Sequence, residues 1–203
     1  MKNKLYILVL YLLTSYASAE SNVNHSIGDF ESYYLNNGMK VLLFPFNDDN
    51  KVGVSVNVKG GAKNELAQEK GYSHIIEHLS FKQAKNFRNI KEFVTTKSNQ
   101  WNGTTNKDFT YYYQSFKNEG SNLEDFIRME SERLFNLEFD EKDLDSEKQI
   151  ILNELQINES SPTNQLFDLT NKQLFSLHPY SHPTIGYEHT IRNSSLKDIK
   201  NFY

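Results

Sequence analysis

The sequence contains no cysteine among its 203 residues. This absence excludes disulfide bonds, a catalytic thiol and a cysteine-based zinc site, so any metal must be held by histidine and carboxylate side chains. Proline and glycine are scarce, with 4 and 9 residues, which excludes collagen-like and Pro/Gly-rich disordered chains. The formal net charge is −4 and no basic block is present, so we expect no nucleic-acid partner.

Long hydrophobic runs are also absent. The longest, Leu5–Leu13, has nine residues, whereas a membrane-spanning helix needs about 20. Lys2 and Lys4 precede this run and the small residues Ala17-Ser18-Ala19 follow it. This order is typical of a secretory signal peptide, residues 1–19, with cleavage after Ala19; the alternative, an uncleaved membrane anchor, fits the small-residue ending less well.

Cleavage after Ala19 would remove two lysines and no acidic residue, so the mature chain would carry a formal net charge of −6. We therefore expect an exported protein with no stable membrane span after cleavage. It would be periplasmic in a bacterium with two membranes and secreted in any other.

The length and a hydrophobic content of 37% predict a single domain over residues 20–203. Alternating apolar residues and an Asn36-Asn37-Gly38 turn predict strands at 33–35, 39–44, 52–58, 100–104 and 109–116. Helical spacing predicts helices at 71–82, 87–97, 121–135, 140–158 and 163–177, the third starting with a capping box of Ser121 and Glu124. Strands followed by helices indicate an α+β fold, with helices packed on one face of an antiparallel or mixed sheet.

The pattern His74-Ile75-Ile76-Glu77-His78 falls within the first predicted helix. Residues four apart lie one turn apart on the same face, so His74 and His78 can face one small object with Glu77 between them. Two imidazoles at this spacing form half of a zinc site, and an interposed glutamate can take a proton from a zinc-activated water. The alternative is a solvated polar helix face, but the flanking Ile75, Ile76 and Leu79 predict a buried helix.

A catalytic zinc site needs a third protein ligand. Glu147 and Glu154 are seven residues apart on one predicted helix, and either could supply it. Helical spacing does not choose between them, nor does it exclude Glu130, Glu132 or Glu159. The loop residues His178 and His182 lie beside Pro179 and Pro183 without helical register, so we expect no metal there.

His74–His78 is the inverted zinc motif of the inverzincins, and its surroundings resemble the pitrilysin/insulinase family, which includes the mitochondrial processing peptidases. The resemblance covers roughly residues 33–203. The matching segments occur in the family's order: Leu35–Val41, Gly60–Glu65, Gly71–His74, Glu77–Phe81, Asn102–Thr104, Asp108–Tyr112, Glu147–Glu154, His178–Tyr180 and Ile185–Gly186. Two departures are Gln83-Ala84, where the family usually has Gly-Thr, and Gly103, where alanine is common.

The resemblance implies a processing-peptidase-like metallohydrolase domain that binds one zinc ion per chain. By resemblance, His74, His78 and Glu154 are the metal ligands, Glu77 is the general base, and Glu147 supports the ligands. Asn102 and Gly103 correspond to the edge strand on which such peptidases dock a peptide or unfolded polypeptide substrate as an added strand.

Family members resemble pairs or quartets of such domains, so the resemblance implies an N-terminal zinc-peptidase domain that is truncated relative to the family. A second domain or a partner subunit would complete the substrate chamber. Three functions follow for comparison: an exported zinc endopeptidase, a non-catalytic or partner-dependent zinc-binding domain, and a lyase that cleaves S-ribosylhomocysteine. The lyase mechanism needs a cysteine, which this chain lacks.

Overall fold

The computed structural model describes residues 5–11, 30–46 and 50–203. The elements, in chain order, are β1 (Leu5–Tyr11), β2 (Glu31–Tyr34), β3 (Lys40–Phe46), β4 (Lys51–Val58), η1 (Ala62–Asn64), η2 (Ala67–Glu69), α1 (Tyr72–Leu79), β5 (Gln83–Ala84), α2 (Ile90–Lys97), β6 (Gln100–Thr105), β7 (Thr110–Lys117), α3 (Asn122–Phe135), β8 (Leu137–Glu138), α4 (Glu141–Ser160), α5 (Pro162–Leu174), η3 (Pro179–Ser181), α6 (Glu188–Asn193) and α7 (Leu196–Phe202).

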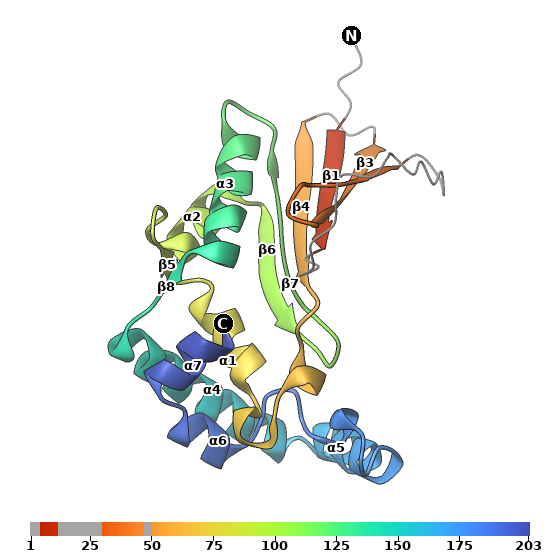
Figure 1. Ribbon diagram of the computed structural model, residues 1–203, viewed down its shortest axis with the longest axis vertical. Helices are drawn as coiled ribbons and strands as arrows, with labels where there is room; N and C mark the ends of the chain where they lie inside the picture. Colours follow the sequence, from red (N-terminus) through yellow and green to blue (C-terminus); the bar gives the residue numbers. More distant parts are fainter. Residues whose placement is uncertain (1–4, 12–29, 47–49) are drawn as a thin grey trace.

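Six strands form one sheet in the order β2-β3-β1-β4-β7-β6. Its pairs are antiparallel except for β1 and β4, which run parallel, so the sheet is mixed. Helices α2 and α3 lie against one side of it, and the remaining helices gather at one end (Figure 1). The predicted α+β class with a mixed sheet is therefore confirmed.

Strand β1 falls inside the segment that the sequence predicts to be a signal peptide. Leu5–Tyr11 pairs with β3 on one side and with β4 on the other. The rest of the predicted signal, residues 1–4 and 12–19, lies outside the described residues. The sequence pattern predicts that Leu5–Tyr11 is the apolar part of a cleaved signal peptide, whereas in the structure it is a strand of the sheet. Cleavage after Ala19 stays a prediction.

Two apolar clusters hold the fold together. In the sheet cluster, buried residues of alternate positions on β4, such as Val52 and Val54, pack with residues of α2 and α3 such as Val94 and Phe126. The rings of Phe116 and Phe126 stack with their centroids 3.9 Å apart.

The helical cluster surrounds α1. Ile75 and Leu79 are fully buried against residues of α4, α6 and α7, among them Leu144, Ile151 and Ile191. Burying such side chains stabilises a fold by about 1.5–3 kcal/mol each. Helix α1 therefore has one side fixed in a core, which leaves the other side to carry polar groups.

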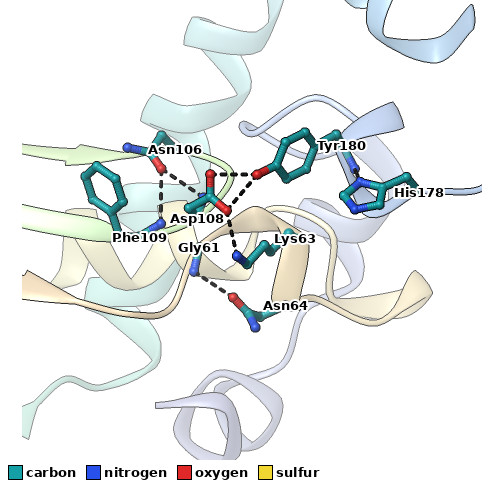
Figure 2. Close-up of polar contacts among 8 residues, drawn as sticks. All are labelled: Gly61, Lys63, Asn64, Asn106, Asp108, Phe109, His178 and Tyr180. Carbon is teal, nitrogen blue, oxygen red and sulfur yellow. Dashed lines mark hydrogen bonds and ion pairs between the residues drawn. The ribbon is translucent and has the colours of Figure 1, made fainter. Parts of the chain in front are cut away.

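The β6–β7 turn is joined to two distant segments (Figure 2). Asn106 Oδ1 accepts hydrogen bonds from the backbone N–H groups of Asp108 and Phe109, which closes the turn. The Asp108 carboxylate then accepts from Lys63 Nζ at 2.6 Å and from the Tyr180 hydroxyl at 2.7 Å. These contacts connect β6 to η1 and to the loop around η3, and they fix the end of the edge strand.

Most predicted elements are present with ends shifted by a few residues, for example the helix predicted at 87–97, which begins at Ile90. The predicted capping box at Ser121 is wrong. Ser121 is the N-cap residue, but its hydroxyl donates to Asp125 Oδ2 at 2.7 Å instead of capping a backbone N–H. Strands β5 and β8 and helices α6 and α7 have no counterpart in the sequence prediction. No helix among the described residues has the length and apolar character that crossing a membrane requires.

Gly186 fixes the approach of the C-terminal helices to α1. Its φ is +87°, and a Cβ at this position would lie 2.6 Å from Gly71 Cα, whereas Gly120, at φ +56°, has nothing within 4 Å of the same point. We expect Gly120→Ala to cost only the left-handed backbone strain, about 1–2 kcal/mol of unfolding free energy. Gly186→Ala adds a clash with backbone and should cost about 3 kcal/mol or more, as measured by urea unfolding. Equal losses in the two variants would contradict this account.

Candidate metal centre

The backbone before α1 sets the direction of this helix. Gly71 adopts φ +102° as the N-cap residue, a conformation that favours glycine. The buried Glu65 carboxylate accepts hydrogen bonds from the backbone N–H groups of Gly71, at 2.9 Å, and of Ser73, at 2.8 Å. Burial raises the pKa of Glu65, while these hydrogen bonds act in the opposite direction. A carboxylate at this end satisfies N–H groups that have no partner within the helix.

Three side chains meet on the polar side of α1. One Glu154 oxygen, Oε2, lies 3.7 Å from His74 Nε2 and 3.6 Å from His78 Nε2. Ligand atoms of all three residues lie within 4.8 Å of one another. These separations exceed hydrogen-bond length. They approach the spacing of about 3.3 Å between tetrahedral zinc ligands, so the donor set His, His, Glu fits a zinc ion.

The protonation of the two histidines differs. Burial, followed by the nearby His78, lowers the pKa of His74 to about 3, so this imidazole is neutral and its lone pair is available to a metal. Burial also opposes the charge of His78, but its hydrogen bond to Glu147 and the neighbouring carboxylates of Glu154 and Glu77 outweigh that effect and raise its pKa. Metal binding at His78 Nε2 would therefore compete with protonation of this ring.

Glu147 lies next to His78 and Lys82. Its Oε2 is 2.9 Å from His78 Nδ1, and its Oε1 is 2.6 Å from Lys82 Nζ. Burial favours the neutral carboxyl, yet the hydrogen bonds from His78 and Lys82 hold the pKa of Glu147 below its ordinary value. A carboxylate on the second imidazole nitrogen orients the ring and makes the metal-facing nitrogen a better ligand.

Glu77 lies between the two histidines in sequence and faces β6. Its Oε2 accepts a hydrogen bond from the Thr105 hydroxyl at 2.6 Å. Burial raises the pKa of Glu77, while the Thr105 hydrogen bond acts against that shift. The sequence prediction did not include Thr105. The predicted strand ended at residue 104, one residue short of β6; with Thr105 included, Gly103 and Thr105 are two residues apart and so lie on the same face of the strand.

β6 is an edge strand of the sheet and carries Asn102 and Gly103. A Cβ at Gly103 would lie 3.1 Å from Glu77 Cγ and 2.9 Å from Phe81 Cε2. The strand backbone therefore passes close to Glu77. Two hollows flank Gly103. One, of about 800 Å³, lies beside Trp101 and Asn102, and the other, of about 420 Å³, lies beside Thr104 and Thr105. His74, Glu77 and Glu154 line both.

The family model for insulinase, peptidase family M16, matches residues 41–188. This chain belongs to peptidase family M16.

Among relatives of this M16 chain is the zinc protease PqqE of Helicobacter pylori, 31% identical over 179 residues, which cover 85% of this chain and 39% of the relative. The crystal structure of a protease from Helicobacter pylori superposes with a TM-score of 0.79 at 29% identity, over 86% of this chain and 42% of that one. The peptidase M16 inactive domain from Pseudomonas fluorescens shares the fold at 15% identity, with a TM-score of 0.73 over 86% of this chain and 42% of that one.

The predicted pitrilysin/insulinase resemblance is thus confirmed, and the M16 chain spans about two fifths of the length of the relatives it matches. Zinc protease is the function named for its relatives, so peptidase chemistry is supported for the family.

The other glutamates that the sequence left open lie elsewhere in the M16 chain. Glu130 is buried and contacts Arg133 at 3.2 Å, and Glu132 accepts hydrogen bonds from Asn86. Glu159 is exposed on α4. His182 is buried with Nε2 2.9 Å from the Ala62 carbonyl oxygen, and His178 Nδ1 accepts from the Tyr180 N–H. Within the described ranges, His74, His78 and Glu154 form the one group suited to a metal.

The glutamates of α4 offer a graded test of this arrangement. We expect Glu154→Ala to cause the largest loss of zinc affinity, and Glu147→Ala to weaken it about 10–100-fold because the His78 ring loses its orienting partner. Glu159→Ala, a matched change on the same helix, should leave the affinity unchanged. Competition with a chromophoric zinc chelator measures all three, and a loss for Glu159→Ala equal to that of Glu154→Ala would refute the assignment.

Proposed function

We propose that this chain carries the catalytic zinc centre of an exported endopeptidase, with one zinc ion per chain and Glu77 as the general base. The observation that carries the proposal is the convergence of His74, His78 and Glu154 beside the carboxylate of Glu77, at the edge strand of the sheet. A zinc ion held by these three residues would lower the pKa of a water molecule and polarise a peptide carbonyl.

Glu77 supplies the proton-transfer step. Its carboxylate would accept a proton from the attacking water and pass it to the nitrogen of the leaving amine as the peptide bond breaks. The Thr105 hydroxyl, 2.6 Å from Oε2, fixes the orientation of this carboxylate. Proton transfer by a positioned side chain contributes about 10²–10⁴-fold to a reaction rate.

Strand β6 supplies the place for the substrate. Asn102 and Gly103 lie on its edge, and Gly103 brings the backbone close to Glu77. An extended peptide that added itself to this edge would place its main chain beside the general base. Main-chain hydrogen bonds read no side chains, so this mode supports peptides and unfolded polypeptides as the substrate class.

A second domain or a partner subunit is part of the proposal. The relatives are more than twice as long as the segment they share with this chain. The two hollows at the metal centre are open grooves on one domain, and a facing domain would enclose a substrate lying on β6.

The role of Glu77 is tested by Glu77→Gln in the full chain. The amide keeps the size of the side chain but cannot take a proton, so we expect normal zinc content and a fall of about 10²–10⁴-fold in cleavage of a quenched fluorescent peptide. Metal content by mass spectrometry and the cleavage rate are measured on the same samples. Cleavage by Glu77→Gln at the rate of the unaltered chain would refute the general-base role.

The alternative is a zinc-binding domain that has no activity of its own or needs a partner to cleave. One structural neighbour is described as an inactive domain of the family, and the likeness to it is one of fold. Zinc bound to the unaltered chain without peptide cleavage, even at high enzyme concentration, would favour this alternative over the endopeptidase.

Export rests on residues 1–19 alone. Lys2, Lys4, the apolar run Leu5–Leu13 and the small residues ending at Ala19 support a cleaved signal peptide. We expect the chain produced in a bacterium with two membranes to be recovered from the periplasm with Glu20 as its first residue, as read by mass spectrometry of the intact protein. Ala17→Asp together with Ala19→Asp should block cleavage, whereas recovery of an intact N-terminus from the unaltered chain would contradict export by this route.

A further inference from the structure

The larger hollow at the metal centre is lined by a group of basic side chains that the smaller hollow lacks. It extends from His74 and Glu77 past Phe81 and Trp101 to the segment before α2 and to the first turn of α4. Four basic residues line it: Lys82, Arg88, Lys91 and Lys142. Lys82 is paired with Glu147 at 2.6 Å. Arg88, Lys91 and Lys142 are exposed and make no ion pair or side-chain hydrogen bond within the described part of the chain.

The acidic residues at the same rim are already engaged. Asp140 and Asp143 form the capping box of α4, where Asp140 Oδ1 accepts from the Asp143 N–H and Asp143 Oδ2 accepts from the Asp140 N–H. The positive end of the helix dipole offsets part of their charge. Arg88, Lys91 and Lys142 outnumber these two carboxylates at the rim, and they make no ion pair in the described part of the chain, so they are available to bind an acidic side chain.

The smaller hollow, on the other side of Glu77, has a different set of lining residues. Phe167, Pro183 and Ile185 line it with Asp168, and no lysine or arginine among the described residues does. A peptide lying along β6 would cross from one hollow to the other, because Trp101 and Asn102 line the first and Gly103, Thr104 and Thr105 line the second. The basic side chains therefore lie at one end of the groove only.

We propose that this peptidase selects substrates with an acidic side chain, Asp or Glu, on the flank of the scissile bond that lies over Trp101, where Arg88, Lys91 and Lys142 bind it. This inference rests on the proposed function, since it assumes that a peptide occupies β6. Exposed ion pairs are individually weak and screened by salt, so the expected preference is modest, about tenfold at low ionic strength.

The test uses the zinc-loaded Glu77→Gln chain, which should bind peptides without cleaving them. Fluorescein-labelled peptides of one sequence carry Glu, Gln or Lys at positions on one flank or the other of a central pair, and fluorescence anisotropy gives their affinities at low and high salt. We expect the Glu peptide to bind about tenfold more tightly than the Lys peptide, on one flank only, with the difference shrinking in high salt. Adding Arg88→Glu and Lys91→Glu should abolish or reverse this order.

A matched control introduces the same charge change elsewhere. Lys59→Glu with Lys172→Glu alters two exposed lysines that line neither hollow, and the preference for Glu peptides should persist. Equal binding of the three peptides, or a preference that survives charge reversal at Arg88 and Lys91, overturns the inference but leaves the proposed function standing on zinc content and cleavage. Binding of no peptide also overturns it, and those two measurements then decide whether the proposed function fails as well.

Discussion

The hydrogen bonds from Gly71 and Ser73 to the buried Glu65 carboxylate fix the helix on which the metal centre depends. Two backbone N–H groups at the start of α1 would otherwise lie in the protein interior without partners, and burying such groups is costly. The carboxylate determines where α1 begins and which way it points. His74, Glu77 and His78 follow within seven residues of Gly71, so a small rotation of this helix would move all three at once. The apolar side of α1 then holds that orientation through Ile75 and Leu79.

The centre concentrates negative charge around two imidazoles. Glu77, Glu147 and Glu154 all influence His78, and together they favour its protonated form. His74 stays neutral, because burial and the neighbouring His78 both disfavour its charged form. One ring is therefore free to bind a cation, whereas at the other a proton competes with that cation. Lys82 contacts the other oxygen of Glu147, and together with His78 it holds the pKa of this carboxylate below its ordinary value.

Local patterns predicted the part of the site that lies on one helix. The helical period placed His74, Glu77 and His78 on a common side because their spacing matches one turn. It did not separate Glu147 from Glu154, which lie two turns apart on one face of α4. The crossing of α4 over α1 separates them, since Glu147 reaches Nδ1 of His78 and Glu154 reaches the Nε2 atoms. Thr105 contacts Glu77 from a strand of the sheet, and Glu65 binds the N–H groups of Gly71 and Ser73 from the loop before α1, so neither contact follows from a helical or strand period. The short helices α6 and α7 gave too few apolar repeats to be recognised, although Ile191 and Ile199 complete the core around α1.

The position of β1 has a consequence for the sheet itself. Leu5–Tyr11 is the strand that joins β2 and β3 to the rest, since β3 and β4 both pair with β1 and are not neighbours of each other. A chain processed at Ala19 would keep helix α1 and edge strand β6 but would lose strand β1, which joins the two parts of the sheet. The backbone groups of β3 and β4 that face β1 would then be open to another strand, on the side of β4 away from the metal. Removal of the first 19 residues would therefore expose two strand edges that β1 covers in this structure.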